Sequence, residues 1–451
     1  MDSTIAALAT APGEAGIGVV RISGPEAWKV ADSVFFPVRQ DLWESRISHR
    51  MLLGALKDGD TRLDQVLCVY MKGPASYTGE DVVEIHSHGG MLIQQKIMDL
   101  LTARGVEPAL PGEFTRRAFL NGKLDLIQAE SILDVIEATS ERGLTLAAAQ
   151  LEGELSREIE DVHEGLLQLI AHTEALLDFP EDELDTLPEK QIRLMAGQYL
   201  DSLRSLTASF RQGRLAREGI RMVLAGRPNV GKSSLLNALL RENRAIVTDI
   251  PGTTRDTIEE KLNLDGLLLR VVDTAGIRDT RDPVEKMGVD RSRQAVEQAD
   301  VVLLLLDATA GFTLEDSRIE QDLTEAGKNY FRVWNKGDLA DNPEGFREGD
   351  LVVSARRDIR FDTISREIRA RVHLDTTLSS ARTVTRLRHH QLLTLAADHL
   401  DSFLAGFSAG MPLDFLSIDL RSAWEALGEV LGRNVTEDIF DRIFSEFCVG
   451  K

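Results

Sequence analysis

A glycine-rich segment, GRPNVGKS at residues 226–233, constrains the possible fold more than any other part of this 451-residue chain. It follows an apolar run at 222–225 and precedes a segment with helical periodicity at 234–240. A strand, a glycine turn and a helix in this order form a phosphate-binding loop, whose backbone N–H groups and helix N-terminus face phosphate oxygens. In such a loop Lys232 reaches the β- and γ-phosphates, and the Ser233 hydroxyl binds Mg²⁺. The segment therefore predicts an α/β domain that binds a nucleotide.

Two later segments indicate which base the nucleotide carries. The sequence NKGD at 335–338 directly follows an apolar run. The Asp338 carboxylate can accept hydrogen bonds from both the N1–H group and the exocyclic amine of guanine, and adenine offers no such pair of donors. The sequence SAR at 354–356 follows the apolar run 351–353, and a backbone N–H there can bind guanine O6. Because both segments follow the phosphate loop and each ends a strand, they favour GTP over ATP.

Two further segments are typical of loops that sense the γ-phosphate. The sequence DTAG at 273–276 ends another apolar run, where Asp273 is expected to hold Mg²⁺ through water and the Gly276 N–H to contact the γ-phosphate. The preceding segment, TDIPGTTRD at 248–256, is rich in hydroxyl groups. A threonine of this segment completes the Mg²⁺ shell only when the γ-phosphate is present, which makes the segment a switch. We expect Thr254 to be that ligand.

The residues that accelerate hydrolysis are not settled by these motifs. Ras-type proteins place a water-orienting glutamine directly after this glycine, whereas here Ile277 stands in that position and cannot bond water. Asp279, Asp282 and Glu285 follow, and each carboxylate is able to position the attacking water. No arginine is obviously placed to neutralise the developing charge. The amide oxygen of Asn229, with carbonyls of the switch segment, is able to hold a monovalent cation there; the alternative is that Asn229 only braces the loop.

The pattern of apolar residues divides the chain into three parts. Residues 1–118 mix short β-like runs with glycine and proline turns, which predicts an α+β domain. Residues 119–217 and 379–451 have the periodicity of amphipathic helices. Between them, at 218–378, strands alternate with helices, as in a parallel α/β sheet. We therefore predict a multidomain chain in which an α/β P-loop GTPase domain of the Ras-like type is inserted into an α-helical central domain.

Composition excludes several classes of protein. The formal net charge is −21, so the overall field does not favour nucleic acid, although a local basic patch still can. The longest aliphatic run, 301–306, is far shorter than the roughly 20 residues that span a bilayer, so we expect no membrane association. The N-terminus does not resemble a signal peptide. Cys68 and Cys448 are the two cysteines, which excludes a disulfide framework and favours a cytoplasmic location.

These motifs, with Asn229 in the loop and Ile277 after the glycine, resemble the potassium-activated GTPases in which a hydrophobic residue replaces the glutamine. Three further segments are YTGED at 77–81, PGEF at 111–114 and the C-terminal FCVGK at 447–451. Together they resemble the MnmE (TrmE) family of tRNA modification GTPases, nearly from end to end.

The resemblance implies an N-terminal domain that binds a tetrahydrofolate derivative (5-formyl- or methylene-tetrahydrofolate) and forms a homodimer, a helical domain and an inserted G domain. It implies a partnership with the flavoprotein MnmG and a reaction at carbon 5 of the wobble uridine of certain tRNAs. The product carries an aminomethyl or carboxymethylaminomethyl group, with a one-carbon unit from methylene-tetrahydrofolate. GTP hydrolysis is expected to follow a K⁺-dependent approach of the two G domains.

Residue roles follow from the same resemblance. The K⁺ ligands would be Asn229, Thr248, Ile250 and Thr253; the Mg²⁺ ligands would be Ser233 and Thr254; and Glu285 would position the water. The expected GTP contacts are Asn229, Val230, Gly231, Lys232, Ser233, Ser234, Thr248, Asp249, Ile250, Pro251, Gly252, Thr253, Thr254, Asp273, Thr274, Ala275, Gly276, Asn335, Lys336, Asp338, Ser354, Ala355 and Arg356. The folate contacts would be Arg21, Glu80, Lys123 and Lys451. Cys448 either takes part in chemistry or is a small buried residue.

Two groups outside these motifs have simpler interpretations. His86 and His88 alternate on a predicted strand without further metal ligands, so we expect them to be structural. The cluster Arg386, Arg388, His389 and His390 is expected to lie on a solvated helix face, with contact to a tRNA backbone as the alternative. Two other functions fit parts of the sequence: a GTPase switch in ribosome assembly, and a folate-dependent transferase whose G domain is regulatory.

Overall fold

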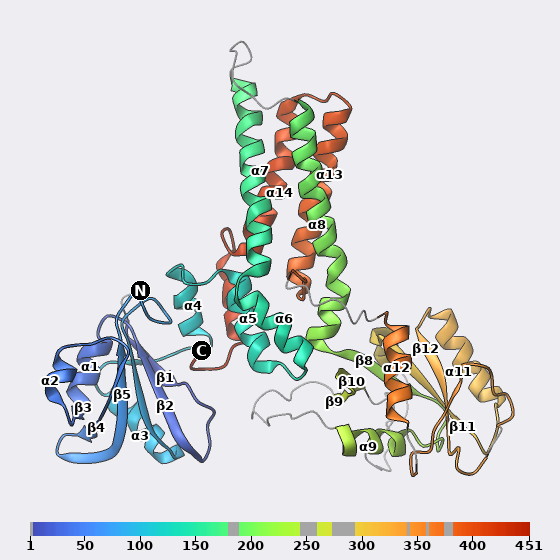
Figure 1. The fold of residues 1–451 in the computed structure, drawn as a ribbon, viewed down its shortest axis with the longest axis horizontal. Helices are drawn as coiled ribbons and strands as arrows, with labels where there is room; N and C mark the ends of the chain where they lie inside the picture. The colour runs from blue at the N-terminus through green and yellow to red at the C-terminus, as the bar shows by residue number, and fades with distance from the viewer. Residues whose placement is uncertain are drawn as a thin grey trace. The chain divides into compact units, whose positions relative to one another are not determined.

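The computed structural model describes residues 3–178, 189–243, 259–272, 294–340, 343–357, 360–373 and 382–451. The chain divides into two compact units, one made of Met1–Leu133 and Trp424–Lys451 and the other of Asp134–Ala423 (Figure 1). The elements are of the kinds expected from the sequence: a mixed α+β region, long helices and a mainly parallel sheet. The limits of the three expected domains stay a prediction.

The first unit is built on a seven-stranded sheet of order β3-β4-β5-β6-β2-β1-β7. Neighbouring strands are antiparallel except β1 and β7, which are parallel. The strands are β1 (Ile5–Leu8), β2 (Ala15–Ser23), β3 (Phe35–Pro37), β4 (Arg50–Asp58), β5 (Thr61–Met71), β6 (Val82–Gly89) and β7 (Glu107–Pro108). The first three helices of this unit are α1 (Ala27–Val34), α2 (Gln40–Glu44) and α3 (Met91–Thr102).

The two faces of this sheet differ. Alternate residues of each strand point to opposite faces, and the residues of one face, such as Val66 and Ile85, are buried in a core with α1 and α3. Trp28 and Trp43 stack in this core with ring centroids 4.3 Å apart. The next residues along the strands leave large apolar side chains exposed on the other face. They include Met51, Leu53 and Leu67.

The last residues of the chain pack against α4 (Glu113–Leu120) in the same unit. The Phe114 N–H donates to the Lys451 carbonyl oxygen at 3.1 Å. Gly112, with φ 67°, precedes α4, and a Cβ there would collide with the Phe444 carbonyl oxygen. Only glycine fits this left-handed position at such a close approach, so the sequence PGEF serves to dock the C-terminal segment.

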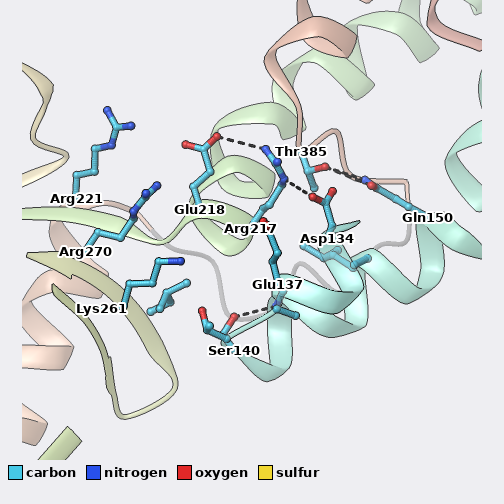
Figure 2. Close-up of a pocket in the computed structure, with 16 residues that line it drawn as sticks. Asp134, Glu137, Ser140, Gln150, Arg217, Glu218, Arg221, Lys261, Arg270 and Thr385 are labelled. Carbon is cyan, nitrogen blue, oxygen red and sulfur yellow. Dashed lines mark hydrogen bonds and ion pairs between the residues drawn. The ribbon is translucent and has the colours of Figure 1, made fainter. Parts of the chain in front are cut away.

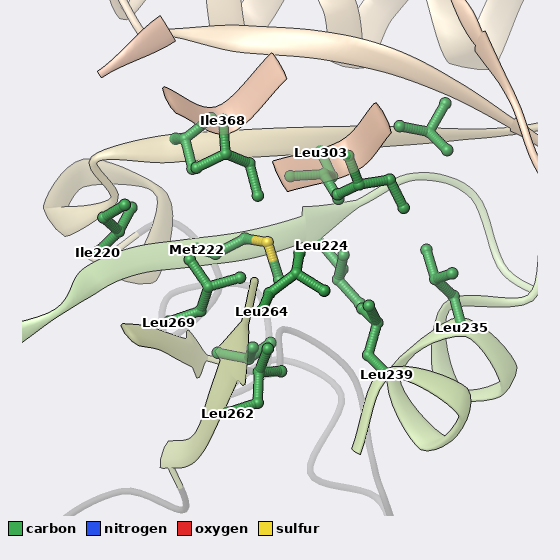
Figure 3. Close-up of a cluster of buried hydrophobic side chains, with 14 of the residues drawn as sticks. Ile220, Met222, Leu224, Leu235, Leu239, Leu262, Leu264, Leu269, Leu303 and Ile368 are labelled. Carbon is green, nitrogen blue, oxygen red and sulfur yellow. The ribbon is translucent and has the colours of Figure 1, made fainter. Parts of the chain in front are cut away.

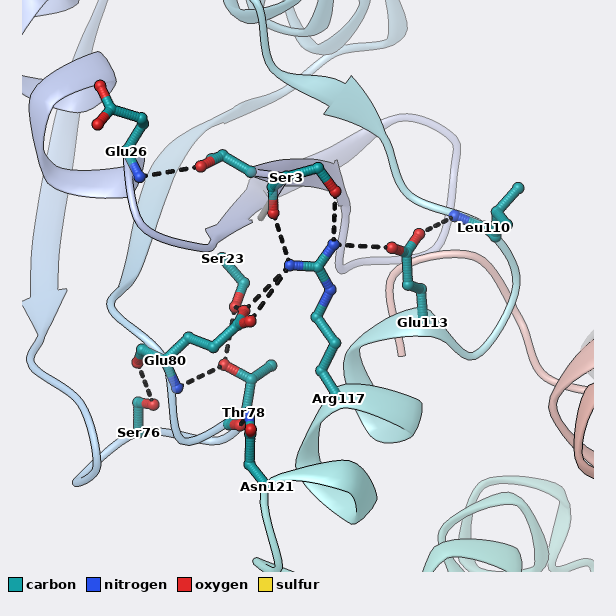
Figure 4. A network of polar contacts seen from close by, with 11 residues as sticks. Ser3, Ser23, Glu26, Ser76, Thr78, Glu80, Leu110, Glu113, Arg117 and Asn121 are labelled. Atoms are coloured by element: carbon teal, nitrogen blue, oxygen red, sulfur yellow. Dashed lines mark hydrogen bonds and ion pairs between the residues drawn. The ribbon is translucent and has the colours of Figure 1, made fainter. Parts of the chain in front are cut away.

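A buried cation organises the surroundings of α4 (Figure 4). The Arg117 side chain is 1 % exposed and forms ion pairs with Glu80 at 3.2 Å and with Glu113 at 2.9 Å. It also donates to the backbone carbonyl of Ser3 at 2.8 Å. Since an ion pair out of water is stable only when its hydrogen bonds are satisfied, Arg117 fixes β1, the loop before β6 and α4 together.

The helices outside the two sheet regions are α5 (Leu126–Glu137), α6 (Glu141–Leu151), α7 (Glu154–Asp178), α8 (Glu189–Glu218), α13 (Leu387–Ser408), α14 (Leu413–Leu431) and α15 (Glu437–Ser445). The longest of them, α7, α8 and α13, belong to the second unit and pack lengthwise (Figure 1). Within the described residues, none of the helices combines the length and apolar character needed to cross a membrane.

The expectation of a solvated face at 386–390 is wrong for most of this cluster. The Arg386 guanidinium forms an ion pair with Asp134 at 2.8 Å. His389 is fully buried, and the His390 ring stacks on Phe210 with centroids 4.4 Å apart. The helix that carries these residues is covered by α8 on this side, which the local charge pattern does not reveal.

The second sheet has the order β13-β12-β11-β8-β10-β9 and is parallel except for β9, which is antiparallel to β10. Its strands are β8 (Ile220–Ala225), β9 (Glu259–Leu264), β10 (Leu267–Val272), β11 (Val301–Asp307), β12 (Tyr330–Asn335) and β13 (Leu351–Val352). Its helices include α9 (Lys232–Asn243), α11 (Leu314–Glu325) and α12 (Phe361–Arg371). β9 was not expected from the sequence, although Asp265-Gly266, with φ of 52° and 78°, forms a tight hairpin turn.

Both faces of this sheet are covered. Met222 and Leu224 of β8 pack with residues of α9 and α12 on one face (Figure 3). Val302 and Leu304 of β11 pack on the other face with Trp334 and residues of α11. This explains the continuous apolar runs in the central strands, as in parallel sheets buried on two sides. The carboxyl ends of β8, β11 and β12 therefore meet at one edge, where polar loops follow.

Candidate nucleotide-binding site

The glycine-rich loop connects β8 directly to α9 and has the backbone conformation that its sequence predicts. Gly226 has φ 144° and Gly231 has φ 100°. A Cβ at Gly226 would collide with the Leu305 carbonyl oxygen, and one at Gly231 would collide with the Asn335 amide. Asn229 also has a positive φ, 64°, a conformation that asparagine tolerates better than most residues. The two glycines are therefore required by close approach as well as by the turn.

Two basic side chains hold this loop in place. The Lys232 Nζ donates to the carbonyl oxygens of Gly226 at 2.6 Å and Arg227 at 2.8 Å, so the loop curls around the ammonium group. The Arg227 Nε donates to Asp316 at 2.8 Å. Asp316 is fully buried and also closes the capping box of α11 with Thr313. This clamp could not be predicted from the sequence, because its two residues are far apart along the chain.

The side chain of Asn335 links the glycine-rich loop to a second loop. Its Nδ2 donates to the Val230 carbonyl oxygen at 2.9 Å, and its Oδ1 accepts from the Ala355 N–H at 3.1 Å. Asn335 is buried. A buried amide with its donor and acceptor both used costs free energy to disturb. Asn335 therefore fixes the relative positions of three strand ends.

The neighbouring residues of the NKGD sequence are also held by polar contacts. The Lys336 Nζ donates to Asp307 at 2.6 Å. Burial alone would raise the pKa of Asp307, but hydrogen bonds from Lys336 and Thr309 outweigh it and lower this pKa. The Asp338 carboxylate accepts from the Ser354 hydroxyl at 2.8 Å. Asp338 is thus oriented by the SAR segment, which the sequence had placed at the same site.

The three loops enclose a cavity of about 560 Å³. Its lining contains most of the described residues that the sequence predicted for a nucleotide site: Asn229, Gly231, Ser234, Asn335, Lys336, Asp338, Ser354, Ala355 and Arg356. The cavity also contains Leu339 and Arg357, which were not predicted. Val230 points into the core instead and contributes its backbone carbonyl. Lys232 and Ser233 begin α9 beside this cavity.

The remaining predicted residues of this site lie outside the described residues. They are Thr248, Asp249, Ile250, Pro251, Gly252, Thr253, Thr254, Asp273, Thr274, Ala275, Gly276 and Glu285. Within the described residues, Asn229 and Ser233 are exposed and carry side-chain oxygen atoms. Such oxygen atoms are hard ligands of the kind that bind Mg²⁺ and K⁺. The described residues contain no cluster of three histidine, cysteine or acidic side chains able to hold a metal ion.

The predicted folate contacts belong to the first unit, and Arg21 lies over two aromatic rings. The Arg21 guanidinium lies 5.3 Å from the Tyr77 ring centroid and 5.7 Å from that of Phe114. Lys451 bonds the Phe114 backbone, as described above, and Glu80 follows Tyr77 by three residues. Burial raises the pKa of Tyr77, partly offset by its hydrogen bond to Thr115 and by the charge of Arg21. The Arg21 guanidinium therefore lies beside two aromatic rings.

Three of the four charged side chains predicted for folate already have a protein partner. The Arg21 Nε forms an ion pair with Glu84 at 2.9 Å. The Glu80 carboxylate accepts from the Ser23 hydroxyl at 2.7 Å in addition to Arg117 (Figure 4). The Lys123 Nζ donates to the Pro74 carbonyl oxygen at 3.1 Å. A carboxylate accepts up to about four hydrogen bonds, so Glu80 keeps capacity for a ligand.

The two cysteines and the paired histidines are placed as follows. Cys448 is exposed, so its interpretation as a small buried residue is wrong. Cys68 is buried, and burial raises the pKa of its thiol well above the usual range. His86 lies 3.3 Å from Glu84, and His88 lies 2.7 Å from Asp64. His86 thus contacts a carboxylate of its own strand and His88 one of β5; their structural role stays a prediction.

Comparisons with known proteins show which proteins this chain resembles. Residues 4–123 match the family described as the GTP-binding protein TrmE N-terminus, and residues 126–448 match the MnmE helical domain. The tRNA modification GTPase MnmE of Heliobacterium modesticaldum is 45 % identical, and that of Alkaliphilus oremlandii is 43 % identical; each alignment covers 100 % of both chains. The solved FeoB G-domain from Methanococcus jannaschii is 28 % identical over 34 % of this chain and 98 % of that chain, with a TM-score of 0.25.

The match to the helical domain alone spans most of the chain, and the curated relatives align with it from end to end. The chain therefore belongs to the MnmE family.

Proposed function

We propose that the chain hydrolyses GTP and acts in tRNA modification, as the names of its relatives state for them. One observation carries the proposal: the ends of three strands meet around a single cavity, and Asn335 fixes the loops that line it. The loop after β8 would bind the phosphates, and the loops after β12 and β13 would bind the base. A binding pocket at the carboxyl edge of a parallel sheet is the usual place for a nucleotide.

The contacts of Asp338 and Ala355 support a specific set of hydrogen bonds to guanine. Ser354 orients the Asp338 carboxylate at 2.8 Å, which leaves acceptor capacity for the N1–H group and the exocyclic amine. The N–H of Ala355 already donates to Asn335. The guanine O6 contact therefore falls to the next backbone N–H, that of Arg356. Adenine offers no such pair of donors, so the Asp338 carboxylate would favour guanine over adenine.

Hydrolysis is proposed to depend on the glycine-rich loop and on residues of the sequence segments 248–254 and 273–285. Lys232 would move from the loop carbonyls to the phosphates, while Ser233 and Thr254 would hold Mg²⁺, with Asp273 acting through water. Asn229, Thr248, Ile250 and Thr253 would hold K⁺. When bound, this ion supplies the positive charge that an arginine supplies in other GTPases. Glu285 would orient the attacking water.

The N-terminal unit is proposed to bind the tetrahydrofolate derivative. The Arg21 guanidinium, with Lys123 and Lys451, would hold the acidic tail, and Glu80 would accept from the pterin ring. Tyr77 and Phe114 offer the aromatic surface beside these charges. Cys448 is exposed in the segment that docks on α4, which is compatible with a role in chemistry.

A homodimer is proposed to form through the open face of the N-terminal sheet. Phe36, Met51 and Leu53 are each more than two-fifths exposed, and Leu67 lies opposite Leu53. Contiguous apolar residues on a sheet face usually mark an interface. Arg21 and Glu84 lie on that same face, because Arg21, Glu84, Val69 and Met51 form one row across β2, β6, β5 and β4. Dimerisation would therefore border the folate site.

The proposed reaction takes place in the cytoplasm with the flavoprotein MnmG. It adds an aminomethyl or carboxymethylaminomethyl group at carbon 5 of the wobble uridine of certain tRNAs. The proposed domains are 1–118 for folate binding and dimerisation, 119–217 with 379–451 for the helical domain, and 218–378 for the G domain. The net charge of −21 does not favour strong direct binding of tRNA by this chain. MnmG would therefore provide much of the contact with tRNA.

Nucleoside analysis of tRNA from cells that lack the protein tests the function. We expect the modification at carbon 5 of the wobble uridine to disappear, to return with the wild-type gene and not to return with Lys232→Ala, because that change removes the phosphate contact. Unchanged tRNA nucleosides, together with altered ribosome profiles, would instead support the ribosome-assembly alternative.

GTP turnover by the full-length protein tests the cation. At equal ionic strength we expect turnover to be about tenfold or more faster in K⁺ than in Na⁺, because an ion of the right size replaces an arginine. Asn229→Gly keeps the positive φ and removes the amide oxygen, so it should abolish the difference. Equal rates in the two salts for the wild-type protein would contradict the K⁺ proposal.

Tetrahydrofolate affinity tests Arg21. Arg21→Gln removes the charge while keeping a donor for Glu84, so we expect about tenfold weaker binding of 5-formyl-tetrahydrofolate, measured by titration calorimetry. GTP turnover should stay at the wild-type level. Arg50→Gln, at an exposed position of β4, serves as the control. If both variants bind folate like the wild type, the folate site lies elsewhere.

A further inference from the structure

Two carboxylates of the second unit, Asp134 and Asp307, each hold a cation that belongs to another element. The Asp134 side chain pairs with Arg217 of α8 at 2.8 Å, and both residues line a cavity of about 240 Å³ (Figure 2). The described residues that line this cavity differ from those that line the nucleotide cavity. The Asp307 carboxylate pairs with Lys336 at 2.6 Å, and Lys336 does line the nucleotide cavity. Of the two carboxylates, Asp307 is therefore the one that can act on a bound nucleotide through its cation.

Asp307 is the last residue of β11, and its carboxylate is held in place independently of Lys336. Its Oδ1 accepts from the Thr309 N–H at 2.9 Å and from the Thr309 hydroxyl at 2.6 Å. Its Oδ2 accepts from the Lys336 Nζ. Burial acts to raise the pKa of Asp307, but the hydrogen bonds from Lys336 and Thr309 lower it below the usual value. The side chain is therefore a fixed negative charge at neutral pH, with one oxygen for its anchor and one for the cation.

The backbone of Lys336 has a conformation that needs support. Its φ is 64°, in the left-handed region that lysine rarely adopts. The Leu339 N–H donates to the Lys336 carbonyl oxygen at 2.9 Å, so Asp338 lies inside a tight turn. Asn335, which precedes the turn, is paired in register with Asp307. The ion pair of Asp307 with Lys336 therefore stabilises the start of the turn that presents Asp338 to the cavity.

The side chain of Lys336 lines the cavity, whereas Asp307, which holds its ammonium group, does not. A lysine has an apolar four-carbon stem between its backbone and its ammonium group. With the Nζ fixed at Asp307, this stem is held along the cavity wall and has already lost rotamer freedom. A base that enters the cavity would contact a stem that costs little further entropy to order.

We propose that Asp307 is a positioning residue for the nucleotide base, because it holds the Lys336 stem against the base and stabilises the turn that carries Asp338. The inference rests on the proposed GTP-binding function. Asp307 itself would touch neither the base nor the phosphates. Contacts to the base are the same before and during cleavage of the terminal phosphate, so the effect of Asp307 belongs in KM and not in kcat.

The variant Asp307→Asn tests this role in the full-length protein. It keeps an acceptor for Thr309 and removes the charge that holds Lys336. We expect titration calorimetry to show about tenfold weaker GDP binding, and the KM for GTP to rise by a similar factor while kcat stays within about twofold of the wild type. Asp322→Asn, at an exposed position of α11, serves as the matched control and should bind GDP like the wild type. Circular dichroism of the nucleotide-free variants should match that of the wild type.

A double-mutant cycle separates action through Lys336 from a general structural effect. Lys336→Met removes the ammonium group, keeps an apolar stem and should also weaken GDP binding about tenfold. If Asp307 acts through Lys336, adding Asp307→Asn to Lys336→Met causes no further loss. Additive losses, or wild-type affinity of Asp307→Asn, would overturn the role of Asp307. A wild-type protein that binds no GDP would overturn the proposed function and this inference with it.

Discussion

The buried amide of Asn335 is the contact on which the nucleotide pocket depends. It joins the glycine-rich loop through Val230 and the SAR segment through Ala355. Three loops that follow three different strands would otherwise be positioned only by their strand ends. Because both polar groups of the amide are satisfied in the protein, the loops are held before any ligand arrives, which reduces the entropy cost of binding. The Arg227–Asp316 ion pair adds a second anchor on the other side of the same loop.

In the N-terminal unit a buried cation, Arg117, connects separate segments as the Asn335 amide does in the nucleotide pocket. Arg117 is almost wholly buried and joins β1, the YTGED segment and α4 through Ser3, Glu80 and Glu113. The C-terminal segment then docks on the start of α4. Residues from both ends of the chain therefore meet around Phe114 within one unit, beside Arg21. The two candidate sites of the protein are thus each organised by one buried polar side chain.

Much of the second sheet and its pocket could be predicted because the signals are local. The loop at 226–233 lies between a strand and a helix in sequence, and the apolar run of β11 is continuous because both faces of that strand are buried. The NKGD and SAR segments follow strand ends. Because the carboxyl ends of parallel strands lie at one edge of a sheet, these segments could be predicted to lie at the same site. The hairpin of β9 and β10 was missed although the Asp265-Gly266 turn marks it.

The features that sequence reasoning did not find depend on pairing between distant residues. The Arg227–Asp316 clamp spans 89 positions. The burial of His389 follows from the packing of α13 on α8, and the contact of Asp307 with Lys336 joins two strand ends that are 29 positions apart. The role of Thr254 was predicted from the hydroxyl-rich segment 248–256 and that of Glu285 from the family resemblance; both residues lie outside the described residues.

The affinity of the Asn335→Ala variant for GDP tests the central claim most directly, because this change removes both contacts and leaves the strands in place. We predict about hundredfold weaker GDP binding, as expected for the loss of two buried hydrogen bonds. Hydrogen exchange should become faster at the Ala355 amide and stay unchanged in β8 and β11. GDP binding within about twofold of the wild type, with the Ala355 amide equally protected, would contradict the account.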